Sequence, residues 1–174
     1  MKTVYWAASG AMFLTLGCST AAFAAGDAAF CEEVKTIAGD AAHAFSMVQG
    51  DKTSQEASTV DPSVIVDHYS VKASLDGATS CEMTVQETAT SDGRHFPNYS
   101  CYFPITGSDK GAATRKLANR VAACLPGISH PSGPGLKKDG GMLTAHSADY
   151  DVSYSFISGS AQNRVVFSIQ SDKN

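Results

Sequence analysis

The sequence predicts an α+β domain in which two helices pack on one face of a mainly antiparallel sheet, held by two disulfides. Three observations predict it. Two segments carry apolar residues at helical spacing, and six shorter segments read as extended, most with apolar and polar residues in alternation. Four cysteines follow an apolar leader. The resulting order, α-βββ-α-βββ, indicates an antiparallel sheet whose apolar face is covered by the helices.

The first predicted helix runs from Asp27 to Gly50. Asp27 suits an N-cap, and Gly50 suits a C-terminal stop. The apolar residues fall at steps of three and four, which makes one stripe along a helix. The stripe consists of Phe30, Val34, Ile37, Ala41, Phe45 and Val48. Residues 51–62 are polar and show no apolar pattern, so we expect a linker loop there.

Three strands follow as a predicted meander. The first covers 64–75 and ends at Asp76-Gly77, which is a strong tight-turn signal. The second alternates apolar and polar residues around Cys81, and the third covers 95–105 with Cys101 at its centre. A hairpin centred near Ser91 would place Cys81 directly opposite Cys101, at a separation that a disulfide bridges.

The second half of the chain has a helix and three short strands in the same order. A helix is expected from an N-cap at Ser108 or Asp109 to Leu125, stopped by proline and glycine. The segment 128–141 is rich in proline and glycine and is predicted to be an exposed loop. The expected strands cover 142–147, 152–157 and 164–170. Their alternation indicates one covered face and one face in water.

The first 24 residues are expected to be a secretory signal peptide. Lys2 precedes an apolar run, and Ala22-Phe23-Ala24 has the small-x-small form that signal peptidase accepts. The apolar run is shorter than the roughly 20 residues that a membrane-spanning helix needs. The mature chain, 25–174, is then a single domain that works in the periplasm or is secreted, where disulfides persist.

An alternative for the leader involves Cys18. The stretch 14–18 is similar to a bacterial lipobox, in which the cysteine is lipidated and becomes the new N-terminus. Thr15 stands where that motif usually has leucine, so the cleavage site after Ala24 is the better match. A diacylglyceryl adduct on Cys18 in an intact-mass measurement would decide for the lipoprotein.

The charge of the chain argues against two classes of partner. The whole sequence has 13 basic and 17 acidic residues, and Lys2 is the only charged residue of the leader, so 12 basic residues remain after its removal. Mild acidity argues against nucleic acid and against an anionic lipid surface as the partner. Lys116 and Arg120 make a small basic strip, expected on the outer side of the second helix.

The four cysteines of the mature chain are expected to form two disulfides, for which three connectivities exist. The hairpin geometry favours Cys81–Cys101, which leaves Cys31–Cys124 to join the two helices. The sequence has no C-x-x-C motif and no cysteine with a histidine at ligand spacing. We therefore predict no metal site, no redox site and no cofactor.

The cysteine framework resembles that of small uncharacterised exported bacterial proteins. These have a first-helix cysteine, phenylalanine before a glycine, Gly-Ala-x-x-Cys, Tyr-x-Cys, and a helix that ends in Cys-Leu-Pro. The matching positions are Cys31, Phe45, Gly50, Gly77 to Cys81, Tyr99 to Cys101, and Cys124 to Pro126. The resemblance implies export and the two bridges, and it implies no catalytic residue, because such a framework specifies a fold and not an activity.

No catalytic motif stands out in the sequence. The glycine–serine stretches lack G-x-S-x-G and a following helix, and the five histidines show no compact ligand spacing. Asp67 and His68 are adjacent on an expected strand, so their side chains point to opposite faces. We predict no catalytic residue.

A binding surface is the remaining candidate. Phe96 and Tyr102 are expected on the strand face opposite Cys101, and Tyr150 is the third exposed aromatic candidate. The alternative is that the loop 126–141 folds over them. The sequence thus predicts a non-enzymatic exported binding protein of inhibitor or immunity type, with an envelope or secreted protein as partner. A small-molecule or lipid carrier that uses the space between helices and sheet is the alternative function, and a small hydrolase ranks third.

Overall fold

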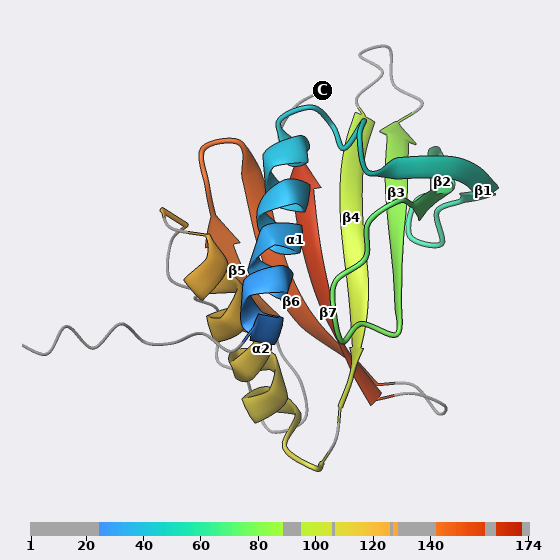
Figure 1. Ribbon diagram of the computed structural model, residues 1–174. Helices are drawn as coiled ribbons and strands as arrows, with labels where there is room; N and C mark the ends of the chain where they lie inside the picture. The colour runs from blue at the N-terminus through green and yellow to red at the C-terminus, as the bar shows by residue number, and fades with distance from the viewer. Residues whose placement is uncertain are drawn as a thin grey trace, which may run out of the picture.

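The computed structural model describes residues 25–88, 95–105, 107–125, 127–128, 142–158 and 163–171. Two helices lie on one face of a seven-stranded sheet (Figure 1). The helices are α1 (Ala25–Ala41) and α2 (Lys110–Cys124). The strands are β1 (Gln49–Ala57), β2 (Val64–Val71), β3 (Ser80–Thr88), β4 (His95–Pro104), β5 (Met142–His146), β6 (Tyr150–Ser158) and β7 (Asn163–Ser171). The fold is α+β, as the sequence predicts.

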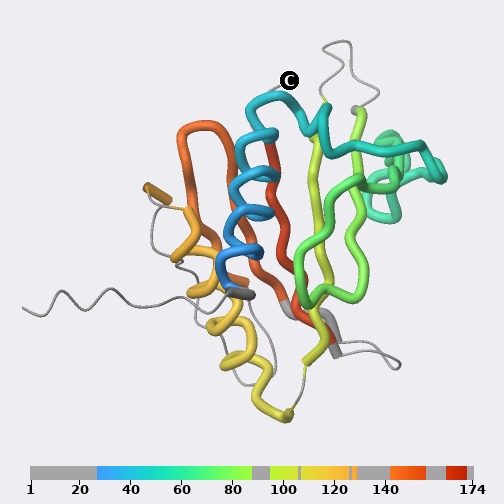
Figure 2. Tube along the Cα trace, in the orientation of Figure 1, coloured from blue at the N-terminus to red at the C-terminus, as the bar shows by residue number. Residues whose placement is uncertain are grey.

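The sheet is antiparallel throughout, with the order β1-β2-β3-β4-β7-β6-β5. The first four strands form a meander. The chain then passes through α2 to the far edge at β5 and returns through β6 to β7, which pairs with β4. Segments from both halves of the chain therefore meet in the centre of the sheet (Figure 2).

The core lies between the helices and the inner face of the sheet. Figures 1 and 2 show the helices in front of the half of the sheet that contains β5, β6 and β7. Near β3 and β4 the same face is packed by chain segments without helix: Phe45 contacts the ring of Tyr99, and the Tyr99 hydroxyl donates to the carbonyl of Ala73 at 2.7 Å. Burial and this bond to a carbonyl are compatible only with a neutral phenol, and burial raises the pKa of Tyr99.

The first helix ends earlier than its apolar stripe predicts. α1 stops at Ala41, and the chain reverses through residues 42–48, where Ala44 and Phe45 have positive φ angles of 53° and 62°. Phe45 and Val48 are nevertheless buried, because the reversal returns them to the core. The apolar stripe therefore predicts burial correctly at all six positions, but it predicts helical structure correctly only as far as Ala41.

The prediction of a linker loop at 51–62 is wrong for its first part, because β1 occupies residues 49–57. Among the described strands it pairs only with β2, and most of its residues are exposed, so its sequence carries no alternation of apolar and polar residues. Gly50 does not end a helix but lies at an irregularity of the β1–β2 pairing. A Cβ at this position would lie 2.9 Å from the carbonyl oxygen of Ser70, so only glycine fits without a backbone shift.

Other predicted elements are confirmed. α2 begins after Asp109, whose carboxylate accepts the amide of Ala112 at 2.8 Å as an N-cap. The turn at Asp76-Gly77 is present, with Gly77 at φ +84°. β4 to β7 lie within two residues of the predicted bounds. The proposed signal peptide with Cys18, the turn around Ser91 and most of the loop 126–141 lie outside the described residues.

Both predicted disulfides are present. Cys81 and Cys101 are direct register partners on β3 and β4, with 4.1 Å between their Cα atoms. Cys31 on α1 is bonded to Cys124 at the end of α2, with 4.8 Å between the Cα atoms. One bridge thus joins neighbouring strands and the other joins the two helices. Among the described residues, no helix is both long and apolar enough to cross a membrane.

Candidate functional site

The face of the sheet opposite the helices, termed the outer face, is the leading candidate for a functional surface. Side chains alternate along β4, so Tyr99 and Cys101 point into the core while Phe96, Asn98 and Tyr102 point to the outer face. No described helix lies on that face (Figure 1). The structure therefore places Phe96 and Tyr102 on the side that the alternation predicts.

Tyr102 is held in place by two charged neighbours on adjacent strands. Its hydroxyl donates to the carboxylate of Glu82 on β3, and the guanidinium carbon of Arg164 on β7 lies 4.2 Å from the centre of its ring. Burial and the bond to Glu82 raise the pKa of Tyr102 to about 12. The phenol is therefore neutral near pH 7, and its ring is oriented before any partner arrives.

A hollow of about 370 Å³ lies on the outer face, farther along β4 from Tyr102. It is lined by one aromatic ring and by amide and hydroxyl groups from four strands: Gln86, Phe96, Asn98, Ser153, Ser168 and Gln170. The Ser168 hydroxyl lies 2.8 Å from that of Ser100, which also accepts the side-chain amide of Asn98 at 3.0 Å. Small serines at the strand centres leave the depression, and the amides at its edge can both donate and accept hydrogen bonds.

A line of titratable groups extends from Tyr102 across the outer face. His68 on β2 lies 3.3 Å from a carboxylate oxygen of Glu56 on β1 and 3.7 Å from one of Glu82. Since Glu82 also accepts the Tyr102 hydroxyl, four strands are linked side chain to side chain. Sequence spacing alone missed this line, because its members come from four different strands and meet only through the register of the sheet.

Tyr150 does not join this surface. Its position on β6 has the same parity as the core residues Val152 and Tyr154, so it faces the helices. There it lines a separate cavity of about 300 Å³ with residues that include Cys124 and Leu125. The structure thus places two of the three predicted aromatic residues on the same face, six residues apart along β4, and the third on the other face.

A buried carboxylate fastens the edge strand β1 to β2. Asp67 is 5% exposed and accepts the Lys52 ammonium and the Gln55 amide, each at 2.7 Å. The hydroxyl of Tyr69 lies 3.4 Å away. The bond from Lys52, with those from Gln55 and Tyr69, holds the pKa of Asp67 below its ordinary value of 3.8 against the opposing effect of burial. His68 next to it points to the opposite face, as the strand alternation predicts.

We expect Asp67→Asn to lower the free energy of unfolding at pH 7 and to weaken its acid dependence. Because the folded state lowers this pKa, the stabilisation is present above the unfolded value of 3.8 and is lost as the pH falls through the folded value. The difference between wild type and variant should therefore be constant above about pH 5 and shrink below about pH 4. Urea unfolding from pH 7 to pH 2.5 measures it.

Lys52→Met serves as the matched test, since it removes the strongest partner of the carboxylate and leaves Asp67 in place. It should weaken the same acid dependence. A constant difference between wild type and Asp67→Asn down to pH 2.5 would show that Asp67 titrates alike in both states.

The basic strip on α2 needs a partial correction. Lys116 is exposed, as predicted, but Arg120 is half-buried against the core edge, with its guanidinium carbon 3.7 Å from the centre of the Phe30 ring. The Arg120 Nε donates to Asp27 at 3.0 Å, and another nitrogen lies 3.7 Å from Asp76. Both basic residues line a cavity between α2 and the sheet.

Comparison with protein-family models, with curated proteins and with solved structures found no match to this chain. Within the described ranges, no three His, Cys, Asp or Glu side chains are grouped closely enough to hold a metal ion. The functional proposals below are therefore based on the geometry of the outer face and of the cavity between α2 and the sheet.

Proposed function

We propose that this chain is an exported, non-enzymatic binding protein that engages a protein of the cell envelope through the outer face of its sheet. The observation that carries the proposal is the Tyr102–Arg164 pair, held by Glu82, on a face without a described helix. Tyrosine and arginine are over-represented among the residues that dominate protein–protein affinity. Side chains that are already oriented lose little conformational entropy when a partner binds.

The dimensions of the face agree with a protein partner. Seven strands at spacings of about 4.8 Å give a width of roughly 29 Å, and eight residues at about 3.3 Å give a length of roughly 26 Å. Their product, roughly 750 Å², is close to the about 800 Å² that each partner buries in a standard interface. A face of this size is therefore large enough for the inhibitor or immunity type of function that the sequence predicts.

The hollow on the same outer face adds specificity to the proposed interface. Its amides and hydroxyls can pair with main-chain groups of a partner, while Phe96 offers an apolar wall. The two disulfides and the sequence features of the leader support work outside the reducing cytoplasm.

Affinity capture from envelope extract with oxidised mature protein tests the proposal. We expect a partner at near-equal stoichiometry whose affinity falls at least about tenfold in Tyr102→Ala, the loss typical of a dominant interface residue. Phe96→Ala should also weaken binding. Arg115→Ala, an exposed position on the helix side, is the control and should bind like wild type.

Circular dichroism of each variant establishes that the fold is retained. A partner whose affinity is unchanged in both folded aromatic variants would overturn the assignment of the outer face. A partner lost in Arg115→Ala alone would move the interface to the helix side.

A further inference from the structure

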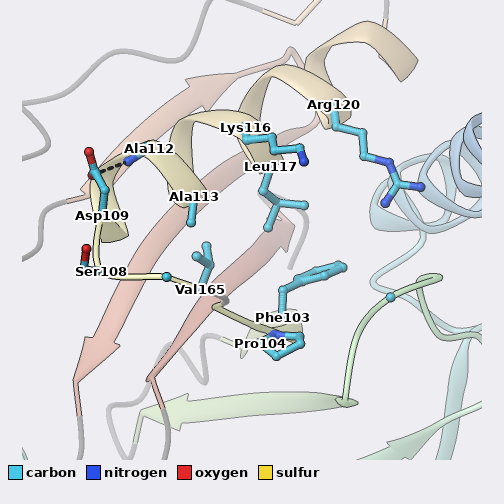
Figure 3. Close-up of a pocket in the computed structure, with 12 residues that line it drawn as sticks. Phe103, Pro104, Ser108, Asp109, Ala112, Ala113, Lys116, Leu117, Arg120 and Val165 are labelled. Carbon is cyan, nitrogen blue, oxygen red and sulfur yellow. Dashed lines mark hydrogen bonds between the residues drawn. The ribbon is translucent and has the colours of Figure 1, made fainter.

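A cavity of about 630 Å³ lies between the N-terminal half of α2 and the ends of β4 and β7. Its volume falls within the roughly 300–1,000 Å³ of ligand pockets in proteins. It is on the opposite side of the sheet from the outer face, and it is independent of the function proposed above. Figure 3 shows the residues that line it.

The inner wall of this cavity is apolar. Phe103 and Val165 rise from β4 and β7, and Leu117 descends from α2 toward them (Figure 3). All three are buried, with at most 8% exposed. Ala112 and Ala113 occupy the helix positions above the strands, and their short side chains leave the space that a longer residue would fill. The wall suits an apolar chain or ring.

The charged residues at the cavity are not equivalent. Arg120 forms ion pairs with Asp27 and Asp76, and its guanidinium lies over the ring of Phe30. The carboxylate of Asp109 accepts the backbone amide of Ala112 as the N-cap. Lys116 is exposed and has no ion-pair partner among the described residues. Among the described residues that line the cavity, the one charge without a partner is therefore positive, and it stands beside an apolar wall.

We propose that this cavity binds a single-chain amphipathic carboxylate, with its alkyl chain against Phe103, Leu117 and Val165 and its carboxylate at the Lys116 ammonium. Each methylene group that the cavity removes from water strengthens binding, and the ammonium supplies a charge-assisted hydrogen bond at the mouth. The complementary charge selects an anion over a neutral or cationic amphiphile of the same length. A fatty-acid anion meets both requirements.

Isothermal titration calorimetry of the mature, oxidised protein tests this with three amphiphiles of equal chain length below their micelle concentrations. The probes are dodecanoate, dodecanol and dodecyltrimethylammonium. We expect dodecanoate to bind most tightly. In Lys116→Glu, the affinity for dodecanoate should fall at least about tenfold. The affinity for dodecanol should stay unchanged, because the substitution reverses only the charge that faces the head group.

Arg115→Glu is the matched control. It makes the same change of charge at the neighbouring, exposed position, which does not line the cavity, so dodecanoate affinity should remain near wild type. Ala113→Phe fills the space below α2 and should remove binding of dodecanoate and dodecanol together.

Three results would overturn the proposal. Equal affinity for the anionic and cationic probes would exclude recognition by Lys116. An equal loss in Arg115→Glu and Lys116→Glu would assign the effect to the net charge of the helix. Absence of dodecanoate binding to a folded wild type would exclude the site itself. None of these bears on the outer face, whose partner is measured separately.

Discussion

Replacing Cys31 and Cys124 together by alanine should lower the free energy of unfolding by about 4–5 kcal/mol, the largest effect we expect from removing one tertiary link. The bridge spans 93 residues of sequence, and the entropy that a cross-link removes from the unfolded chain grows with the loop that it closes. It also joins α1 to α2, so its loss frees the first helix from its partner. Urea unfolding of oxidised wild type and variant at one pH measures the difference.

The Cys81–Cys101 pair is the internal control for this prediction. It closes only 20 residues and joins strands that are already paired in register, so its double alanine variant should lose about 3 kcal/mol. Both variants replace two half-cystines by alanine, which keeps the chemical change equal. A larger loss from the shorter loop would show that native packing around the hairpin, and not loop length, determines the stabilisation.

Asp40→Ala should lower the free energy of unfolding by about 2–6 kcal/mol, because it leaves two backbone amides without their partner and each such loss costs about 1–3 kcal/mol. Asp40 is fully buried, and one of its carboxylate oxygens accepts the backbone amides of Met47 at 2.8 Å and Val48 at 2.9 Å. Those bonds hold the reversal between α1 and β1. Two residues of this reversal, Ala44 and Phe45, have left-handed backbone angles that non-glycine residues adopt only at a cost.

Asp40→Asn separates the hydrogen bonds from the charge. The amide oxygen can accept both backbone amides, while its nitrogen replaces the second carboxylate oxygen, which has no partner among the described residues. We expect this variant to stay within about 1 kcal/mol of wild type in the same urea titration. A loss equal to that of Asp40→Ala would mean that the negative charge itself, and not the acceptor oxygen, stabilises the reversal.

Local patterns were sufficient for most of the fold. Alternation identified the strands around Cys81, Cys101 and Val152, and an N-cap with a proline–glycine stop placed α2. Such signals arise because a strand or helix that is covered on one face must repeat its apolar residues at its own period. The hairpin symmetry about Ser91 also placed Cys81 opposite Cys101, since register follows directly from a centre of symmetry.

Edge and reversal elements escaped these patterns. β1 is an exposed edge strand whose residues pack against little, so burial imposes no period on its sequence. The end of α1 was hidden because Phe45 and Val48 continue the apolar stripe while the backbone has already left the helix. The pairing with β2 makes residues 49–57 a strand, and the bonds to Asp40 hold the reversal after α1. Neither interaction shows in the apolar pattern of the sequence.

The sequence by itself determined the class of fold, the two disulfides and the outward direction of Phe96 and Tyr102. The fold class follows from the order of the elements and the outward direction from the period of one strand. The symmetry of one hairpin pairs Cys81 with Cys101 and leaves Cys31 for Cys124. Only the tertiary structure decided that Tyr150 faces the helices, that Glu82 and Arg164 hold Tyr102, and that Lys116 lines a cavity. These relations join residues from strands and helices distant in the chain. They depend on the order in which seven strands are laid side by side, which local periodicity does not encode.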